Sequence, residues 1–405
     1  MKHSNNNQES IETISVNATT KKRIKELDMV KGLVIILVVL RHINELTGIS
    51  GLDNFYTRFF STFFESFMIL YFLCSGYVYK SKGTVLQDIG KKAKDLLCPF
   101  IGYGIFDTAI YFLRYIVIEK QSILWFLDNT LTNFAGLSNW NIRLGIAGNN
   151  QMHYAFVPYW FVLQLFAAFC LFIPIEKMVR SKGVAVRILV AVFLVNVSVV
   201  LNHYDVQHTL TDTFSSSVSL IFVLINIVGF AGVLMIGSLL NEIAAFDIEN
   251  QPVNMIMIMM ICCLGIGTIL FLTDKDSTYA LQYGRWGDCG SYSIILTIIG
   301  GISVIYFLAV CMHFARKIPG VENFLCYLGV NSLSILMMHF IVAETICWIR
   351  GYWFDVYHDP YPMEKISISN YLITVLGTAV ILFIYMELRY QYIRRKQNRL
   401  EKIEN

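Results

Sequence analysis

The sequence predicts an all-α integral membrane protein, built as a bundle of about ten transmembrane helices. Of its 405 residues, 56% are hydrophobic and 15% are charged, whereas about a quarter of the residues of soluble proteins are charged. The mean hydropathy of +0.56 agrees with this composition. Apolar segments of about 20 residues, the length that a helix needs to cross a bilayer, recur from residue 29 to residue 390. We therefore expect the lipid bilayer to surround most of the chain.

Ten apolar segments account for the predicted helices, read by hydrophobicity and length. They cover residues 29–47, 57–79, 95–118, 154–178, 184–203, 216–240, 253–273, 291–314, 328–349 and 367–390. The longest piece between them, 119–153, contains the stretch ILWFLDNTLTNF, and its apolar patches are typical of a segment that lies along the membrane surface. The predicted organisation is a disordered cytoplasmic tail at 1–27, a membrane domain at 28–390 and a basic cytoplasmic tail at 391–405.

Lysine and arginine orient the predicted bundle. One side carries clusters of them, and the opposite loops carry scattered single charges such as Lys120, Arg143, Lys275 and Arg285. The clusters comprise Lys21, Lys22, Arg23, Lys25, Lys80, Lys82, Lys91, Lys92, Lys94, Lys177, Arg180, Lys182, Arg187, Arg316, Lys317 and the tail residues Arg394, Arg395, Lys396, Arg399 and Lys402. Because cytoplasmic loops are enriched in these residues, both termini are predicted to be cytoplasmic. The net charge of +3 then reflects topology, and we expect no nucleic-acid partner.

The first predicted helix carries polar residues where an apolar helix is expected. Its second half, LVVLRHINEL at 37–46, contains His42 and Glu45. Lys31 and His42 are eleven residues apart, which is close to three full turns of an α-helix and corresponds to about 16 Å along its axis. Asp28 and Glu45 extend the same face by about one turn at either end. The spacing therefore predicts one polar stripe of Asp28, Lys31, His42 and Glu45.

This polar stripe indicates either a functional site or a structural cluster that joins helices. Ionisable groups deep in a membrane usually face the bundle interior or an aqueous cavity and serve a function. The imidazole of His42 titrates in the range that suits a general base. Glu45 is placed to hydrogen-bond that imidazole and set its tautomer, as a carboxylate does in a catalytic triad, although Arg41 is an alternative partner for Glu45.

Five motifs, in order along the chain, resemble the membrane acyltransferase-3 family of O-acyltransferases. The first is a basic residue, ten intervening residues and a histidine, here Lys31 and His42, although Lys31 is a less frequent choice and Arg41 stands where the family commonly has a small or apolar residue. The others are YFLCSGYVY with Phe72, Ser75 and Gly76, KKAKDLLCPF with Lys91, Lys94 and Pro99, VPYWFVLQL around Trp160, and YLGVNSLSILMMHF with Gly329, Ser332 and His339. The resemblance extends from about residue 24 to residue 390.

The resemblance implies a membrane enzyme that moves an acyl group, expected to be acetyl, from cytoplasmic acyl-coenzyme A to a hydroxyl. The expected acceptor lies outside the cytoplasm or is exported, with a cell-surface polysaccharide as the main candidate, and the expected location is the plasma membrane. His42 would act as the general base, or alternatively as the nucleophile that carries the acyl group, with Glu45 beside it. Lys31, Lys91 and Lys94 would hold the phosphates of the donor, unless they only express the cytoplasmic bias in positive charge. No metal is expected.

Further candidates for the acceptor site come from the later apolar segments. Arg114, in YFLRYIV, lies deep in the third segment and needs a partner such as Glu45, Glu65 or an acceptor anion. Ser75, Trp160 and His339 complete the set. For Ser75 the alternative is close packing together with Gly76, and for His339 it is a purely structural hydrogen bond.

Two other functions compete with the enzyme. A transporter or exporter of a glycan or small polar solute could use the polar stripe as its path, but the sequence lacks paired segments broken by glycine or proline and visible inverted halves. A membrane sensor or scaffold without catalysis is the third interpretation, and the predicted His42–Glu45 stripe argues against it.

Overall fold

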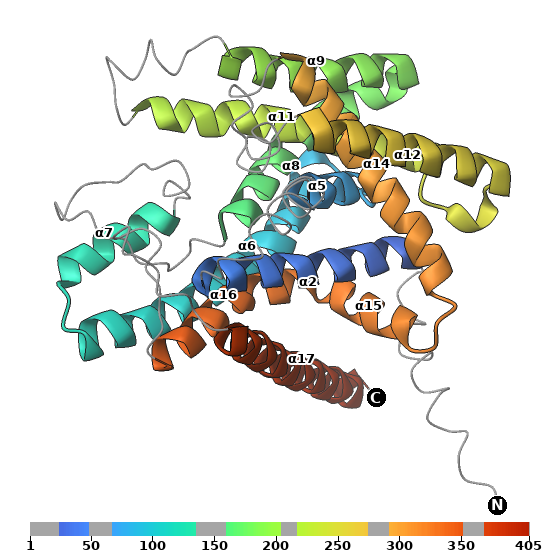
Figure 1. The fold of residues 1–405 in the computed structure, drawn as a ribbon. Coiled ribbons are helices and arrows are strands. Elements are labelled where there is room, and N and C mark those ends of the chain that lie inside the picture. The colour runs from blue at the N-terminus through green and yellow to red at the C-terminus, as the bar shows by residue number, and fades with distance from the viewer. Residues whose placement is uncertain are drawn as a thin grey trace, which may run out of the picture.

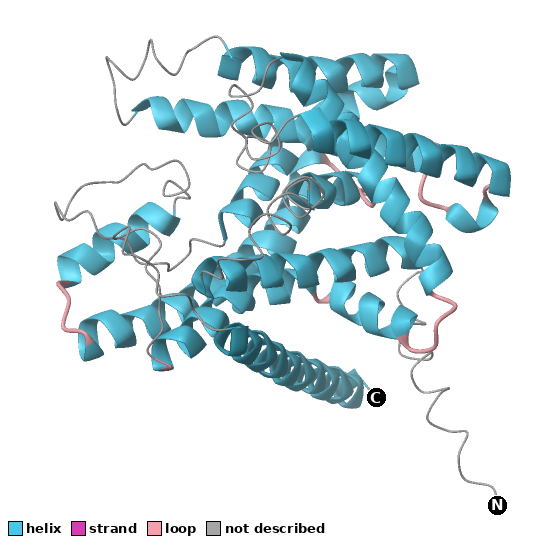
Figure 2. Ribbon diagram, in the orientation of Figure 1, coloured by secondary structure: helices cyan, strands magenta, loops and turns pink. Residues whose placement is uncertain are grey.

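The computed structural model of the protein describes residues 24–47, 67–134, 159–203, 217–273, 291–350 and 368–404. Within these ranges every regular element is a helix, as Figure 2 shows. The predicted all-α class is confirmed for this part of the chain. The cytoplasmic tail predicted at 1–27 lies almost entirely outside the described residues and stays a prediction.

The helices follow the predicted apolar segments closely. In chain order they are α2 (Lys25–Thr47), α5 (Phe67–Tyr77), α6 (Val85–Phe112), the π-helical turn η2 (Leu113–Ile118), α7 (Ile123–Phe134), α8 (Trp160–Val179), the 3-10 turn η5 (Arg180–Lys182), α9 (Val184–His203), α11 (Ser217–Glu242), the 3-10 turn η6 (Ile248–Asn250), α12 (Val253–Thr273), α14 (Ser291–Ala315), α15 (Val321–Val330), α16 (Ser332–Ile349) and α17 (Ile368–Glu404). Each of the ten predicted segments overlaps at least one of these helices. The last helix does not stop at residue 390, because α17 continues through the basic tail to Glu404.

Among the described residues, four helical stretches are long and apolar enough to cross a membrane: Val85–Ile118, Phe161–Lys182, Ser332–Ile349 and Ile368–Arg395. Shorter apolar helices cover Val184–Ser198, Asn226–Glu242, Val253–Gly265, Ile302–Ala315 and Val321–Val330. In α2, the charged residues Lys31, Arg41 and Glu45 interrupt the apolar run. The apolar helices support a membrane protein, whereas the number of ten spans and the cytoplasmic position of the termini stay predictions.

Helix α2 lies in the interior of the bundle. It packs against α5, α14, α15, α16 and α17, and Figure 1 shows it in blue across the middle of the molecule with α15 and α16 alongside. Met29, Val30, Val34 and Ile43 of α2 are all fully buried. The position of α2 follows from its sequence, because a helix that carries several charged side chains is poorly suited to a face that contacts lipid.

Glycine allows α2 and α15 to touch along their backbones. A Cβ atom on Gly32 of α2 would collide with the carbonyl oxygen of Leu325, and one on Gly329 of α15 would collide with the carbonyl oxygen of Asp28. Small residues at a helix crossing permit this approach, as is common in membrane helix packing. The two glycines therefore fix where α15, and α16 directly after it, lie along α2.

A second glycine contact and a buried ion pair hold the other half of the bundle. A Cβ on Gly76 of α5 would collide with the carbonyl oxygen of Leu234 in α11, which supports the packing role that the sequence suggested for Gly76. Arg187 of α9 pairs with Glu176 of α8 at 2.9 Å and donates to Ser238 of α11 at 3.0 Å. Arg187 was counted among the basic residues of a cytoplasmic loop, but its side chain is buried between these three helices.

Candidate active site

The stripe on α2 begins with an ion pair. The ammonium nitrogen of Lys31 lies 2.5 Å from a carboxylate oxygen of Asp28, one turn earlier on the helix. The hydroxyl of Tyr71, on α5, donates to the backbone carbonyl of Lys31 at 3.4 Å. Both charged side chains are only partly buried, at 24% and 15% exposed. The predicted common face of Asp28 and Lys31 is thus present in the structure, and Asp28 compensates the charge of Lys31.

About three turns further along α2, His42 lies against a second histidine. The ring centroids of His42 and His339 are 5.1 Å apart, and their planes are tilted by 37°. The ring of Phe340, the next residue of α16, lies nearly perpendicular to that of His42, with an angle of 83° between the planes and a centroid distance of 5.7 Å. His42 is half-buried, whereas His339 is fully buried. Two histidines that are almost 300 residues apart in the sequence therefore meet where α2 packs on α16.

The ring of His339 is held by its own helix. Its Nδ1 atom lies 2.8 Å from the carbonyl oxygen of Leu336 and 3.1 Å from that of Ile335. A carbonyl oxygen can only accept a hydrogen bond, so Nδ1 is the nitrogen that carries the hydrogen. In the neutral ring Nε2 then carries the lone pair. The predicted alternative for His339, a structural hydrogen bond, is present, but the ring also contacts His42.

Arg114 joins a buried polar cluster at the other end of α16. Its guanidinium lies 2.8 Å from Glu344 and 3.0 Å from Glu119, and Glu344 also accepts a hydrogen bond from the hydroxyl of Tyr111. The guanidinium carbon lies 5.3 Å from the centroid of the Trp348 ring. The described partners of Arg114 are therefore Glu344 and Glu119, which the sequence did not nominate. Two partners that the sequence did nominate, Glu65 and the side chain of Glu45, lie outside the described residues.

A π-helical turn presents Arg114 to this cluster. The backbone N–H of Glu119 donates to the carbonyl of Arg114 at 2.9 Å, a spacing of five residues instead of four. Such turns are rare and occur frequently at functional sites. Arg114 and Tyr115 are both buried in this turn, and His339 and Glu344 lie about 7.5 Å apart along the axis of α16. One helix thus connects the histidine pair with the Arg114 cluster.

The remaining predicted site residues are distributed over other helices. Ser75 is half-buried on α5, and Lys91 and Lys94 are exposed on the first part of α6. Helix α6 packs mainly against α8 and α16, so its principal contacts do not bring Lys91 and Lys94 to Lys31. The backbone of Trp160 begins α8, but the side chain of Trp160, like that of Glu45, lies outside the described residues.

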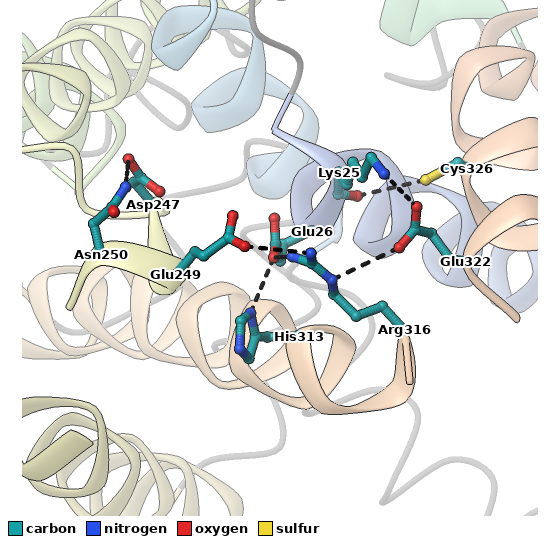
Figure 3. A network of polar contacts seen from close by, with 9 residues as sticks. All are labelled: Lys25, Glu26, Asp247, Glu249, Asn250, His313, Arg316, Glu322 and Cys326. Carbon is teal, nitrogen blue, oxygen red and sulfur yellow. Dashed lines mark hydrogen bonds and ion pairs between the residues drawn. The ribbon is translucent and has the colours of Figure 1, made fainter. Parts of the chain in front are cut away.

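A polar network surrounds the start of α2, and sequence reasoning missed it. Figure 3 shows Arg316, which follows α14, between carboxylates from three parts of the chain. Its guanidinium lies 2.8 Å from Glu26, 3.5 Å from Glu249 and 3.7 Å from Glu322. Lys25 pairs with Glu322 at 2.6 Å. These cations are already paired with carboxylates, so the network holds helices together and is a poor site for phosphate groups.

Glu26 is the buried centre of that network. His313 of α14 lies 3.1 Å from the same carboxylate oxygen that Arg316 contacts. Burial works to raise the pKa of Glu26, but hydrogen bonds from the backbone, His313 and Arg316 outweigh it and hold the pKa below its ordinary value. The ion pair with Glu26 in turn raises the pKa of Arg316. The network therefore stabilises its charged form at neutral pH.

Comparison with known proteins identifies the family. The family model Acyl_transf_3, described as an acyltransferase domain, matches residues 24–388. The chain belongs to the acyltransferase-3 family. The resemblance noted from the five motifs is confirmed, and the match includes every helix that carries a candidate site residue. The family and the apolar helices together show an acyltransferase of the membrane.

One curated relative of the acyltransferase-3 chain is the nodulation protein NolL of Sinorhizobium fredii (strain NBRC 101917 / NGR234). The two are 33% identical over 106 residues, which is 24% of this chain and 28% of NolL. Because the chain spans little more than a quarter of the length of NolL, the likeness supports the family and leaves the substrates of this protein to be proposed. No solved structure matches the chain at a significant level.

Proposed function

We propose that this protein is an O-acetyltransferase of the plasma membrane that uses cytoplasmic acetyl-coenzyme A and acetylates a hydroxyl of an extracytoplasmic or exported polysaccharide. The observation that carries the proposal is the histidine pair. In a chain of the acyltransferase-3 family, His42 meets His339 in the bundle interior, about 16 Å along α2 from the Lys31–Asp28 pair. Two imidazoles inside an apolar bundle supply the proton acceptor that acyl transfer requires.

The chemistry assigns the transferred proton to His42. The imidazole takes the proton from the acceptor hydroxyl as its oxygen attacks the thioester carbonyl carbon. The carbon–sulfur bond then breaks, and the departing thiolate of coenzyme A receives the proton from the His42 imidazolium. The half-buried position of His42 suits this role, because the ring contacts His339 and Phe340 while the side chain stays partly accessible. In the alternative route, His42 first takes the acetyl group itself and passes it on.

The donor would enter from the side of the predicted cytoplasmic lysines. Lys31 is proposed to contact a phosphate of acetyl-coenzyme A, together with the exposed Lys91 and Lys94. Asp28 compensates Lys31 in the structure, so donor binding would require the phosphate to compete with that carboxylate. The pantetheine arm would then follow α2 toward His42. For the acceptor, Arg114, Ser75 and Trp160 remain the proposed contacts.

Purified protein in liposomes tests this function. We expect transfer of radiolabel from [14C]acetyl-coenzyme A to at least one member of a panel of neutral, acidic and amino-sugar oligosaccharides. The His42→Ala protein, checked for folding by size-exclusion chromatography in detergent, is the matched control. Movement of unmodified oligosaccharide across the liposome membrane, with no acetyl label in glycan, would support a transporter instead.

A further inference from the structure

The contact between His42 and His339 leaves open which group orients the base. In catalytic triads a carboxylate accepts the N–H of the histidine, so that the other ring nitrogen presents its lone pair to the substrate. The sequence nominated Glu45, three residues after His42 on the same helix, for this task. The structure offers a different group, because His339 and Phe340 both contact the His42 ring and His339 is the one of the two that can accept a hydrogen bond.

The geometry of His339 makes its ring a fixed acceptor. The two backbone carbonyls at Nδ1 hold both the orientation and the tautomer of the ring, so Nε2 of the neutral ring is the nitrogen that can accept. The side chain is fully buried, which limits competition from water. Two imidazoles joined edge to edge by a hydrogen bond of about 2.9 Å have centroids about 5 Å apart. The observed separation of 5.1 Å is close to that value, and the buried Nε2 atom of His339 accepts no hydrogen bond from the residues that the structure describes, so the bond from His42 requires a small rotation of the His42 ring.

We propose that His339 is the positioning residue of the reaction, which accepts the N–H of His42 at Nε2 and so directs the other nitrogen of His42 to the acceptor hydroxyl. This inference rests on the proposed acetyl transfer. His339 moves no proton itself: its Nδ1–H stays on the backbone carbonyls throughout, and the proton taken from the hydroxyl resides on His42 until the thiolate leaves. Backbone carbonyls of α16 thus orient His339, and His339 orients His42, in the way that a chain of hydrogen bonds fixes a histidine in metal and triad sites.

Two conservative variants of His339 separate orientation from packing. In His339→Asn, the side-chain amide can still donate to the carbonyl of Leu336 but does not reach His42. In His339→Gln, the amide oxygen reaches the place of Nε2 and can accept. With [14C]acetyl-coenzyme A and the oligosaccharide panel, we expect His339→Asn to lower kcat by about 10–100-fold, the range found when the orienting partner of a histidine is removed. The KM for acetyl-coenzyme A should change less than twofold, and His339→Gln should recover most of the rate.

A double variant tests whether His339 acts through His42. Residues that act as a unit give strongly non-additive losses. In the His42→Ala background, measured over long incubations, His339→Asn should therefore lower the residual transfer no further. Glu45→Gln serves as the comparison, and we expect a smaller loss from it than from His339→Asn. Size-exclusion chromatography and equilibrium binding of acetyl-coenzyme A confirm that each variant is folded.

The outcomes separate this inference from the proposed function. Transfer by the wild type, together with a folded His339→Asn protein of wild-type rate, would overturn the role of His339 and leave the function standing. The role of His339 would also be overturned if His339→Asn lowered the residual transfer of the His42→Ala protein by the same factor as it lowers transfer by the wild type. If His339→Asn does not fold, a folded His339→Gln protein that is as inactive as His42→Ala would refute the inference by itself. A wild type that acetylates no member of the panel and hydrolyses no donor would refute both.

Discussion

Arg114 of the π-helical turn and Glu344 of α16 form an ion pair of 2.8 Å in which both side chains are almost completely buried. Tyr111 donates to the same carboxylate, and Trp348 lies over the guanidinium. The pair therefore ties the end of α6 to the helix that carries His339. Breaking such a pair leaves an uncompensated buried charge, which usually costs more than the pair itself contributes.

The first prediction separates the structural and functional roles of this pair. Arg114→Met should destabilise the protein by about 3–5 kcal/mol, because it removes the cation that compensates the buried Glu344 carboxylate. Glu344→Gln should cost less, because Arg114 keeps its ion pair with Glu119. The double variant Arg114→Met/Glu344→Met should recover much of that stability, as measured by thermal unfolding in detergent. If Arg114 also binds the acceptor, the recovered double variant should show a raised KM for oligosaccharide. A double variant with wild-type kinetics would assign the pair to structure only.

The second prediction concerns His42, the proposed general base. His42→Ala should fold, because removing a polar side chain from an apolar helix lowers the cost of insertion. It should still bind acetyl-coenzyme A, since Lys31 lies three turns away along α2, while transfer falls at least about 100-fold. Radiolabel transfer and equilibrium donor binding measure the two effects. Near wild-type transfer by a folded variant would refute the proposed mechanism.

The third prediction concerns Lys31 and Lys94, which are proposed to bind the phosphates of the donor. Lys31→Ala and Lys94→Ala should raise the KM for acetyl-coenzyme A more than they lower kcat, with about 1–3 kcal/mol lost per phosphate contact. Asp28→Asn should have the opposite effect on KM, because it frees Lys31 from its carboxylate partner. Lys82→Ala, an exposed lysine on the same predicted side, is the control. An unchanged KM in Lys31→Ala and Lys94→Ala would remove both lysines from the donor site.

The fourth prediction follows from the lowered pKa of Glu26. A carboxyl whose pKa is lower in the folded state stabilises the protein above its unfolded pKa and loses that contribution as the pH falls through the folded value. The wild type should therefore unfold at a higher temperature than Glu26→Gln at neutral pH, and the difference should shrink as the pH falls below the ordinary value of 4.5. Glu249→Gln, at a more exposed carboxylate, should have little effect at any pH. Parallel pH curves for wild type and Glu26→Gln would contradict the role given to Glu26.

The fifth prediction tests the orientation of the bundle. Cys289 lies in the loop at 274–290 that is predicted to face outward. In intact cells it should react with a membrane-impermeant maleimide, whereas a tag after Asn405 should become accessible only on permeabilisation. A Cys289→Ser protein identifies the labelled site. A tag that is accessible in intact cells would reverse the topology.

The helices could be predicted well from the sequence, because each corresponds to an apolar segment that is recognised by its length and hydrophobicity. The apolar segments at 184–203, 253–273 and 291–314 match α9, α12 and α14 almost to the residue. The proximity of Lys31 and Asp28 could be predicted equally well, since helical spacing alone places both residues on one face. The division of α15 from α16 at Asn331 was not predicted, because both helices are apolar on either side of it.

The contacts between helices could not be predicted in the same way. The His42–His339 contact depends on how α2 crosses α16, and no pattern within either helix reports that crossing. For Arg114 a signal existed: Glu344 is an acid in another apolar segment, and two opposite charges that each need a partner are candidates for each other. The network around Arg316 joins parts of the chain about 290 residues apart and had no comparable signal.

The backbone contact between Gly32 and Gly329 has a consequence for the distant histidines. His42 follows Gly32 by ten residues, and His339 likewise follows Gly329 by ten residues. Helix α2 on one side, and α15 followed by α16 on the other, therefore cover the same number of residues from the glycine contact to the two imidazoles, which meet where α2 packs on α16. A methyl group on either glycine would push the two helices apart at this contact, so the alignment of the two imidazoles is set about 15 Å away from them, by two residues that have no side chain.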